Sequence, residues 1–526
     1  MKNKLTALLL LSQMFLACCA GGSAAEVNSS QVYTPESTDY FPDKGWRTST
    51  PEEQGMDSEL LLQMLQTVQR EKVPLHSVVI IRNGYLVLEA YFDPYHRETW
   101  HNIYSATKSV TSTLAGIAMD EGKISGIDQK ITDLFPALKV PDNQLNLEDS
   151  TLENILTMTA GHTSDSSDTI YGSTNWPQDF YNLPFSTKPG ETFLYDSGAA
   201  HLAACAVKQA TQENVSAYAK EHLFAPLGIN EYSWEMSTEG IQTGGWGIRM
   251  APVDMARFGY LFLRKGVWNG QQIVSSQWIS KATAEHEKGF WGDYMKNGYG
   301  YFWWMNSFGG FRADGYAGQY IYVLPEQDIV AVFTGGINYT ETYQPGKLMT
   351  EFIIPSVTSD TTLPDNSKSV VELATLIQTL ESPKTEAVPA LPAMVNSISG
   401  KNIATKAFIT SFSLNFASQN ECNFTIMQEG KEIVLPVGMD GVYRVSDAIQ
   451  VGTLVWYPPY QSVALKGQWV SEDTFLIHWQ YVGEPYQEEY VITFHGESAT
   501  LEVSEYVVGF AGSMQPYMKY TAVMQD

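Results

Sequence analysis

Cysteine is scarce in this chain, which has four among 526 residues: Cys18, Cys19, Cys205 and Cys422. The last two lie far apart, in stretches of different pattern, so we do not expect a framework of disulfides to hold the fold together. Cys205 stands in an apolar stretch of helical pattern, where cysteine usually behaves as a small apolar side chain. We therefore expect a buried side chain there and not a reactive thiol.

Basic residues are also few: 32 Lys and Arg stand against 58 Asp and Glu, which gives a formal net charge of −26. Such a charge repels a phosphate backbone, and no stripe of Lys and Arg interrupts it. Nucleic acid is therefore not an expected partner. We interpret the charge as a contribution to solubility.

Beyond the N-terminal segment, no run of about 18 or more apolar residues occurs, so we expect no membrane-spanning helix in the body of the protein. The N-terminal segment combines a basic start at 1–4 with an apolar run at 5–17 and then small residues, which is typical of an export signal. Residues 15–18 also resemble a bacterial lipoprotein cleavage box that would place a lipid on Cys18, although Cys19 leaves the register open. We predict an exported protein in the periplasm or on the outer surface of a bacterial membrane, with lipid anchoring as one option.

What the chain does have is ample apolar material, with 44% hydrophobic and 12% aromatic residues, as in globular proteins. Its length exceeds what a single hydrophobic core supports, so more than one domain is expected. Changes in composition divide it into an export signal (1–25), a polar stretch (26–42), a first domain (43–357), a linker (358–391) and a β-rich domain (392–526).

The first domain has strand patterns at both ends and helical patterns between them. Asn83-Gly84 joins two alternating apolar runs, which is the strongest short-range signal of a hairpin. The economical packing is one antiparallel sheet covered by helices, which is an α+β fold. Strands are expected within 76–92, 298–306, 311–324 and 328–335, and helices within 51–69, 343–357 and most of 102–288.

The remainder of the chain changes pattern twice. The linker is rich in Ser, Thr, Asp and Pro around one helical piece at 370–380. From position 398 onward, short aromatic and β-branched runs alternate with polar turns, as at 452–457, 474–481 and 489–494. We expect a separate all-β unit.

Ser105 and Lys108 stand three positions apart at the start of a helical run, so the two side chains share a face of the helix. A hydroxyl is a poor nucleophile by itself, and a lysine whose pKa is lowered by burial can accept its proton. The spacing alone is a weak signal, because a helix-capping serine followed by a solvated lysine has the same pattern.

Tyr195 strengthens the catalytic interpretation. It opens Tyr195-Asp196-Ser197, which follows the turn at 188–191 and precedes a helical stretch. A tyrosine at that place can relay a proton between a nucleophile and a leaving group. The structural alternative is a half-buried aromatic ring beside a helix start.

With these residues in place, residues 46–357 resemble the class C β-lactamase family in its broad sense. That family includes D-alanyl-D-alanine carboxypeptidases, family VIII esterases and 6-aminohexanoate-dimer hydrolases. The last branch is the most similar in the first and last of the matching segments, which are 49–56 (STPEEQGM), 104–109 (YSATKS), 156–162 (LTMTAGH), 226–229 (PLGI), 244–247 (GGWG) and 318–323 (GQYIYV).

The resemblance implies a β-lactamase/transpeptidase-like fold, with a five-stranded antiparallel sheet flanked by helices and a mostly helical middle subdomain. It also implies that Ser105 is acylated, that Lys108 and Tyr195 handle its proton, and that the backbone amides of Ser105 and Tyr316 hold the oxyanion. Neither a metal nor a cofactor is implied. The C-terminal region resembles the lipocalin-like barrels that some related hydrolases carry.

One family element departs from the pattern. The family often has Lys or His, then Thr or Ser, then Gly, and counting back from position 318 places Ala313-Asp314-Gly315 there. The usual cation for a substrate carboxylate is missing, which disfavours β-lactams and D-Ala-D-Ala peptides and leaves esters and amides open. Arg249 is either a replacement cation or part of an ordinary salt bridge.

Other site candidates carry less weight. Ser197 stands where the family has Asn and still offers a donor and an acceptor. Trp176 and Tyr171 either line the cleft or serve packing. No His pair has metal-ligand spacing and no Gly-x-Ser-x-Gly sequence occurs, so a metal site and a Ser-His-Asp hydrolase both lack support.

We therefore predict a serine hydrolase that cleaves an ester or amide bond of a small-molecule or peptide-like substrate through an acyl-enzyme. The activity could be that of an esterase, an amidase or a peptidase. The alternative is a binding protein that becomes acylated without turning over, like a penicillin-binding protein, or a catalytically dead relative. The sequence leaves the oligomeric state open.

Overall fold

The computed structural model describes residues 40–42, 44–142, 146–170, 172–288, 298–405, 409–450, 460–496, 498–506 and 516–524. The predicted export signal at 1–25, together with Cys18 and Cys19, lies outside the described residues. So do Tyr171 and the strand predicted at 452–457.

The predicted hairpin is present as β1 (Leu75–Arg82) and β2 (Tyr85–Tyr91). Asn83 and Gly84 form the turn with φ angles of 51° and 75°. Positive φ at both central residues matches the twist of the two strands, and Asn and Gly adopt it at little cost. A Cβ at Gly84 would lie 2.6 Å from the Tyr260 hydroxyl, so close packing also favours glycine there.

The hairpin belongs to an antiparallel sheet with strand order β2-β1-β13-β12-β11-β10-β9-β8. Its first five strands correspond to the predicted five-stranded sheet, and three two-residue strands extend it. Leu75 of β1 pairs with Gly335 of β13, so strands from the two ends of the predicted first domain lie next to each other in the sheet. The added strands are β8 (Glu287–Lys288), β9 (Gly298–Tyr299), β10 (Trp304–Met305), β11 (Phe311–Gly315), β12 (Gln319–Leu324) and β13 (Ile329–Gly335).

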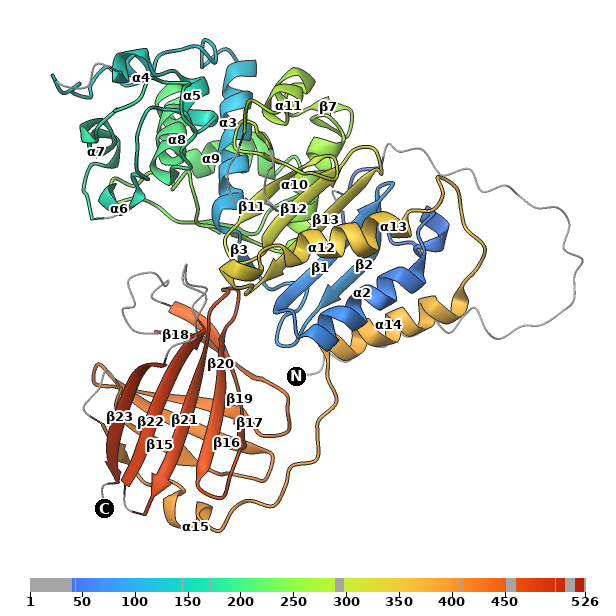
Figure 1. The fold of residues 1–526 in the computed structure, drawn as a ribbon, viewed down its shortest axis with the longest axis vertical. Coiled ribbons are helices and arrows are strands. Elements are labelled where there is room, and N and C mark those ends of the chain that lie inside the picture. Colours follow the sequence, from blue (N-terminus) through green and yellow to red (C-terminus); the bar gives the residue numbers. More distant parts are fainter. Residues whose placement is uncertain are drawn as a thin grey trace, which may run out of the picture. The chain divides into compact units, whose positions relative to one another are not determined.

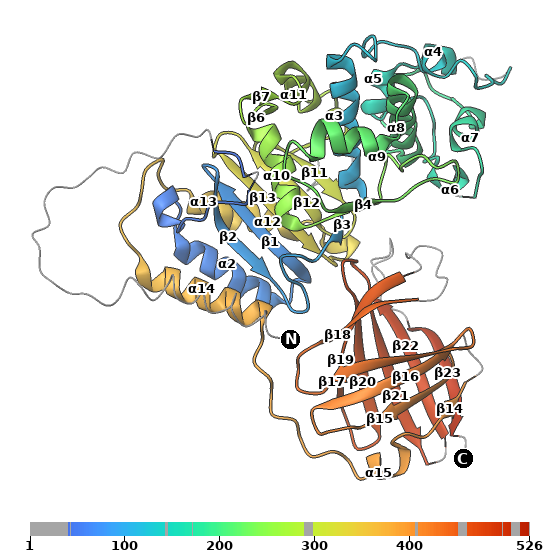
Figure 2. The ribbon, with the colours of Figure 1, turned by 180° about the vertical axis from the view of Figure 1, so that it is seen from behind.

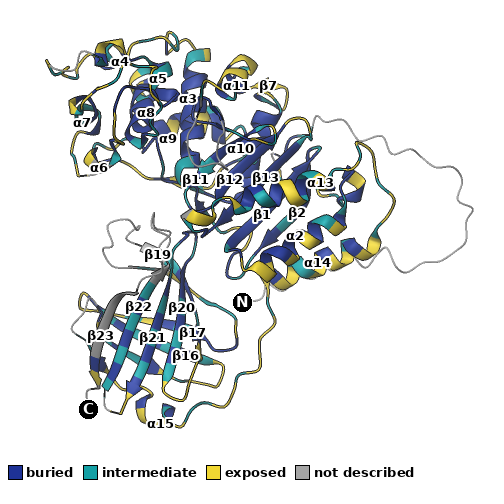
Figure 3. Ribbon diagram, in the orientation of Figure 1, coloured by how far each residue is buried: buried dark blue, intermediate teal, exposed yellow. Residues whose placement is uncertain are grey.

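Both faces of this sheet are covered, as the alternation of side chains along β1 shows. Val79 and Ile81 point into one hydrophobic core, and Val78 and Ile80 point into a second. On the side of the second core, helix α14 (Ser367–Glu381) packs on β2 and against helix α2 (Ser58–Glu71) (Figure 1). Helix α10 (Pro252–Leu263) packs on β12 and β13 from the other side (Figure 2). The strands between these layers are almost entirely buried (Figure 3).

The middle of the chain is mostly helical, as predicted, and it contributes to the first core. Its longest helices are α3 (Thr107–Asp120) and α8 (Ser197–Thr211), which pack against each other. The shorter elements are η2 (Tyr104–Ala106), α4 (Ile131–Leu134), α5 (Leu152–Leu156), α6 (Ser167–Ile170), α7 (Trp176–Asn182), α9 (Val215–Ala219), η4 (Lys220–Phe224) and α11 (Ser276–Ala282), with the strands β3 (His101–Asn102), β4 (Tyr232–Trp234) and β5 (Ile248–Met250).

The segments that follow the sheet differ in detail from the sequence-based expectation. The predicted closing helix is divided into α12 (Gln344–Leu348), the π-helical η6 (Met349–Ile353) and α13 (Ile354–Ser356). The helical piece of the predicted linker is longer than expected, because α14 buries Leu373 and Leu380 in the second core. This part of the chain therefore packs with the sheet.

Apart from the short helix α15 (Val395–Ile398), the C-terminal region is made of strands and forms a closed barrel, as predicted. Nine strands form the ring, β17-β16-β15-β14-β23-β22-β21-β20-β19, which the β17–β19 pairing closes, and β18 pairs outside it with β19. Buried and partly exposed residues alternate along β16 and β21, so one set of side chains fills the barrel. The strands are β14 (Ile403–Ala404), β15 (Ile409–Asn415), β16 (Glu421–Gln428), β17 (Lys431–Gly438), β18 (Arg444–Gln450), β19 (Tyr460–Trp469), β20 (Thr474–Tyr481), β21 (Gln487–His495), β22 (Ser498–Tyr506) and β23 (Pro516–Met524).

Among the described residues, no helix combines the length and the apolar character needed to cross a membrane.

Candidate active site

Ser105 lies in the one-turn helix η2, which leads directly into α3. The turn is held by its neighbours: the Tyr104 amide donates to Asn102 Oδ1 at 3.0 Å, and the Ile103 amide donates to the Ile248 carbonyl at 2.9 Å. Tyr104 has a φ of 46°, which is uncommon for a residue with a side chain. Such backbone strain persists only where the surrounding contacts impose it.

Lys108 is almost completely buried one turn further along α3. Its Nζ lies 3.0 Å from Ser105 Oγ, 3.1 Å from Ser197 Oγ and 2.9 Å from the Gly245 carbonyl oxygen. The Gly245 carbonyl can only accept, whereas each hydroxyl can also donate. A neutral Lys108 can therefore donate to Gly245 and Ser197 and accept the Ser105 proton, with every group satisfied.

Electrostatics favour that neutral form. Burial lowers the pKa of Lys108 from its ordinary value of 10.5 to about 7, and the carboxylates of Asp165, Asp196 and Asp314 limit the decrease. A substantial fraction of the amine is then unprotonated at neutral pH. Lys108 has both the position and the protonation state of a general base.

Tyr195 hydrogen-bonds Ser105 from another direction, and its ring centroid lies 4.6 Å from Lys108 Nζ. Its ring also stacks on Trp304 at 5.9 Å. Burial, the largest effect, raises the pKa of Tyr195, and nearby carboxylates add to the increase, while the bond to Ser105 opposes it. The phenol is therefore neutral at physiological pH, which suits a proton relay better than a primary base.

Asp196 fixes the start of α8 and thereby places Tyr195 and Ser197. Its carboxylate accepts from the Gly198 amide at 2.8 Å, from Ser166 Oγ at 2.5 Å and from His162 Nδ1 at 3.0 Å. Burial alone would raise the pKa of Asp196, but the hydrogen bonds from His162 and Ser166 bring it below its usual value. This aspartate is an anionic helix cap, and His162 is its partner.

The third family element lies beside the nucleophile turn at the end of β11. A Cβ at Gly315 would lie 2.2 Å from the Ile103 carbonyl oxygen, so glycine permits this approach. Tyr316 follows, and its ring centroid lies 5.4 Å from that of Tyr104. Ala313 is fully buried in the first core, and Asp314 pairs with Arg312 at 3.0 Å. The element therefore has a buried alanine where the family often has a cation, and a paired carboxylate at the next position.

The family model described as Beta-lactamase matches residues 60–348, which is more than half of the chain. The chain belongs to the beta-lactamase family. It is similar to the 6-aminohexanoate-dimer hydrolase of Paenarthrobacter ureafaciens, with 23% identity over 310 residues that cover 54% of this chain and 79% of that protein.

The chain is also similar to solved structures. A candidate beta-lactamase from Bacteroides dorei DSM 17855 gives a TM-score of 0.50 at 16% identity, covering 58% of this chain and all of its own. A family VIII carboxylesterase gives 0.47 at 15% identity and covers 58% of this chain and 98% of its own. The family model confirms the resemblance predicted from the sequence, and the Bacteroides dorei structure agrees with the predicted fold.

Arg249, the possible replacement cation, forms an ion pair in this beta-lactamase-family hydrolase. It lies on β5, opposite Asn102 of β3, and its Nη1 is 2.5 Å from Oε1 of Glu484. The side chain of Glu484 is 1% exposed and that of Arg249 is 15% exposed. The salt-bridge alternative therefore describes the contact that the structure shows.

Trp176 is 4% exposed and packs between His201 and Trp246, with ring centroids 4.8 and 5.7 Å away. Trp246 follows Gly245, whose carbonyl receives the Lys108 hydrogen bond. Trp176 is thus a buried side chain in contact with the residue that follows Gly245.

Three site residues were not singled out from the sequence. The Gly245 carbonyl binds Lys108, the Asp165 carboxylate accepts from the Ser197 amide at 3.2 Å, and Glu484 pairs with Arg249. Gly245 belongs to a matching family segment, so its place in that segment was a usable signal. Asp165 lies in a polar loop and Glu484 in the β-rich region, where no local pattern marks them.

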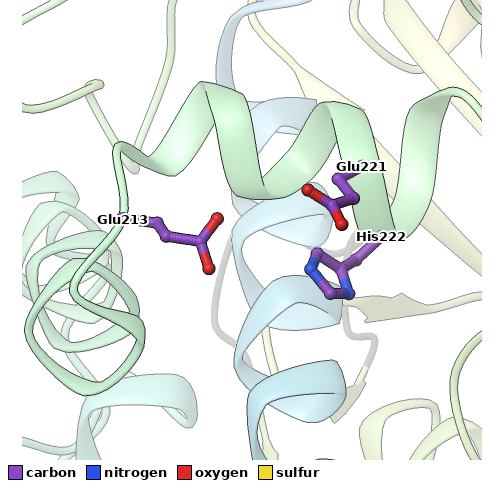
Figure 4. Close-up of side chains that lie close together, drawn as sticks. All are labelled: Glu213, Glu221 and His222. Atoms are coloured by element: carbon purple, nitrogen blue, oxygen red, sulfur yellow. The ribbon is translucent and has the colours of Figure 1, made fainter.

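A separate group of possible metal ligands lies elsewhere in the fold. Glu213, Glu221 and His222 offer ligand atoms that all lie within 4.8 Å of one another (Figure 4). His222 Nδ1 is 2.8 Å from Glu121, and Lys123 Nζ is 3.7 Å from Glu213. Two of the three side chains, His222 and Glu213, thus already have partners of opposite charge or potential charge. No other such group is found in the described part of the chain.

Proposed function

We propose that this protein hydrolyses ester or amide bonds through a covalent acyl-enzyme on Ser105. The observation that carries the proposal is the contact between Lys108 Nζ and Ser105 Oγ at 3.0 Å, in a site where the lysine pKa is about 7. A buried amine at that distance and with that pKa can take the hydroxyl proton at neutral pH.

The reaction then proceeds in two stages. Ser105 Oγ attacks the substrate carbonyl carbon while its proton passes to Lys108, and the backbone amides of Ser105 and Tyr316 stabilise the oxyanion. Tyr195 passes the proton to the leaving alcohol or amine as the ester or amide bond breaks. Water then attacks the acyl-enzyme along the same proton path and releases the acid and free Ser105.

The substrate proposal follows from charge. Ala313 supplies no cation, and Arg249 is paired with Glu484, so no observed feature favours a free substrate carboxylate at this side of the site. Two similar proteins are described as a 6-aminohexanoate-dimer hydrolase and a family VIII carboxylesterase. We therefore propose neutral esters and linear amides as the substrate class.

Substitution of the nucleophile tests the mechanism. Ser105→Ala and Lys108→Ala are expected to reduce kcat/KM for p-nitrophenyl butyrate by roughly 10³-fold or more. Lys188→Ala is the matched control, because Lys188 is exposed and its ammonium lies 4.0 Å from Glu191 in a surface ion pair. Hydrolysis by Ser105→Ala at the wild-type rate would refute the proposal.

Intact-protein mass spectrometry separates enzyme from binder. After a chromogenic ester, the wild type should show a transient acyl adduct on Ser105, and after a fluorophosphonate a permanent one. A permanent adduct with the ester would instead support an acylated binding protein. A panel of p-nitrophenyl esters, a chromogenic cephalosporin, D-alanyl dipeptides and linear amide oligomers would then define the substrate.

A further inference from the structure

The loop between β20 and β21, residues 482–486, reaches the strand that leads into the nucleophile turn. The Asn102 amide donates to the Gly483 carbonyl at 2.9 Å. Gly483 has a φ of 83°, and a Cβ there would lie 2.3 Å from the Trp100 carbonyl oxygen. On the other side, a Cβ at Gly336 would lie 2.5 Å from the Pro485 carbonyl oxygen. Two glycines, one on each partner, thus allow this close approach.

The loop is also braced from within the barrel. Gln480 is buried, and its Nε2 donates to the carbonyl oxygens of Tyr481, Glu484 and Tyr486 at 2.9–3.2 Å. One amide group therefore ties three points of the loop together. The loop conformation is fixed by its own contacts as well as by those with the nucleophile strand.

Glu484 carries the only carboxylate of this loop, and that carboxylate is fully buried between three partners. Oε1 lies 2.5 Å from Arg249 Nη1 and 3.4 Å from Asn102 Nδ2. Oε2 accepts from the Tyr104 hydroxyl at 2.5 Å. Removing one member of a buried pair leaves the other charge uncompensated, which gives this contact a large electrostatic effect.

These partners lie in the nucleophile turn or on the strands β3 and β5 that hold it. Tyr104 directly precedes Ser105, and Asn102 accepts the Tyr104 amide. Arg249 follows Ile248, whose carbonyl accepts the Ile103 amide and whose own amide donates to Thr107 Oγ1 at 3.3 Å. The Glu484 carboxylate thus contacts residues on both strands that hold Ser105.

We propose that Glu484 is a specificity-determining residue that neutralises Arg249 and so excludes substrates with a free carboxylate beside the scissile bond. The proposal rests on the proposed ester and amide hydrolysis. Without the Glu484 charge, Arg249 would be a largely buried cation close to the nucleophile turn that the nearby Glu235 carboxylate offsets only in part, and a substrate carboxylate would add to that compensation. The barrel therefore sets the charge preference of the hydrolytic site.

Selectivity between a neutral and an anionic ester tests this proposal. The ratio of kcat/KM for mono-p-nitrophenyl glutarate to that for p-nitrophenyl butyrate is measured for each variant of the full chain. Glu484→Gln keeps the shape and one acceptor oxygen but removes the charge, and the ratio is expected to rise about tenfold or more, which corresponds to about 1.4 kcal/mol. Arg249→Met should change the ratio in the opposite direction.

Two further variants serve as controls. The double variant Arg249→Met/Glu484→Gln removes both charges and should bring the ratio back to within about twofold of the wild type, because the local charge is again balanced. Tyr104→Phe removes the hydroxyl contact and leaves the ion pair, so it should lower kcat without changing the ratio. A general loss of structure would lower both activities and would not reverse sign between the two single variants.

The outcomes separate the two proposals. If the wild type hydrolyses neither ester, the proposed function fails. If the wild type is active and the ratio is unchanged in Glu484→Gln and in Arg249→Met, the specificity proposal is overturned. If Glu484→Gln does not fold, as judged by its melting curve, then Arg249→Met and the double variant still decide the matter by the direction of their ratios.

Discussion

At the residue scale, burial deprives the Lys108 ammonium of its hydration, and three neutral oxygens replace water only in part. The nearby carboxylates of Asp165, Asp196 and Asp314 compensate incompletely, so the pKa settles at about 7. The same environment keeps Tyr195 protonated. The surroundings of the two groups, more than their intrinsic pKa values, thus suit Lys108 to the role of base and Tyr195 to the role of proton donor.

This division predicts the pH dependence of the reaction. Acylation needs neutral Lys108, so kcat/KM for p-nitrophenyl acetate should rise about tenfold per pH unit below pH 7 and level off above it.

The lowered pKa of Lys108 also affects the stability of the fold. Because the folded pKa lies below the ordinary 10.5, the unfolded chain binds more protons between about pH 7 and pH 10.5. The contribution of Lys108 to stability therefore increases with pH across that interval.

Asp165→Asn sharpens the test. The Asp165 carboxylate raises the pKa of Lys108, so its neutralisation should move the rising limb of the profile to lower pH. Asp149→Asn is the control, since Asp149 is exposed and pairs with Lys130 on the surface. A limb that stays in place or moves to higher pH in Asp165→Asn would contradict the assignment of the limb to Lys108.

The catalytic candidates were accessible from the sequence because each stands in a local motif. Ser105 and Lys108 are one helical turn apart, and the structure brings Tyr195 to them through the cap at Asp196. Glu484 lacks such a signal, since its role depends on a loop of another part of the chain meeting Arg249. Contacts of that kind depend on tertiary packing, and the spacing of residues in the sequence does not predict them.

At the scale of elements, strand β11 and the helix η2 approach so closely that only glycine fits between them. Gly315→Ala would place a Cβ 2.2 Å from the Ile103 carbonyl, so either the nucleophile turn or β11 must shift. We expect kcat to fall by about 10²-fold, because misplacement by about 1 Å has that effect, with a loss of about 1–3 kcal/mol in stability. Kinetics with p-nitrophenyl butyrate and urea unfolding would measure both.

Gly172→Ala is the matched control for this prediction. Nothing lies within 4 Å of a Cβ at Gly172, so the same chemical change meets no backbone there. Its kinetics and unfolding free energy should equal those of the wild type. Wild-type activity in Gly315→Ala would show that η2 and β11 can separate without disturbing Ser105.

Elements with strong local signals were predicted well. The Asn83-Gly84 hairpin is present, and β20 spans the predicted 474–481. The helix of the linker was predicted too short, because polar residues flank its apolar face and only the contact with α2 and β2 extends the helix. The π-helical η6 likewise has no sequence signal, since its geometry arises within a longer helical run.

At the scale of the whole molecule, the two described cysteines lie in different hydrophobic cores. Cys205 belongs to the first core and Cys422 to the barrel core, and burial raises the pKa of both thiols. We therefore expect a thiol reagent to label these two positions only after denaturation, as peptide mapping would show. Labelling of native Cys205 or Cys422 at the rate of a free thiol would contradict this burial.

Export remains a proposal that rests on the sequence alone. If residues 1–25 direct export and Cys18 carries a lipid, labelled palmitate should enter the protein in a bacterial host and Cys18→Ser should abolish its incorporation. Cys19→Ser is the control that fixes the register. Incorporation that depends on Cys19 would shift the predicted cleavage by one residue, and cytoplasmic retention of the full chain would refute export.

The pairing of β1 with β13 has a consequence in time. The β1–β13 pair cannot form until Gly335 has been synthesised, and hundreds of residues separate Leu75 from Gly335 in the chain. At a rate of about 5–20 residues per second, tens of seconds separate the two strands at the ribosome. During that delay β1 exposes Val78 to Ile81, a run that is fully buried in the finished fold. We expect the nascent chain to need a chaperone during this interval. The same delay keeps the chain unfolded, which is the state that an export channel can translocate.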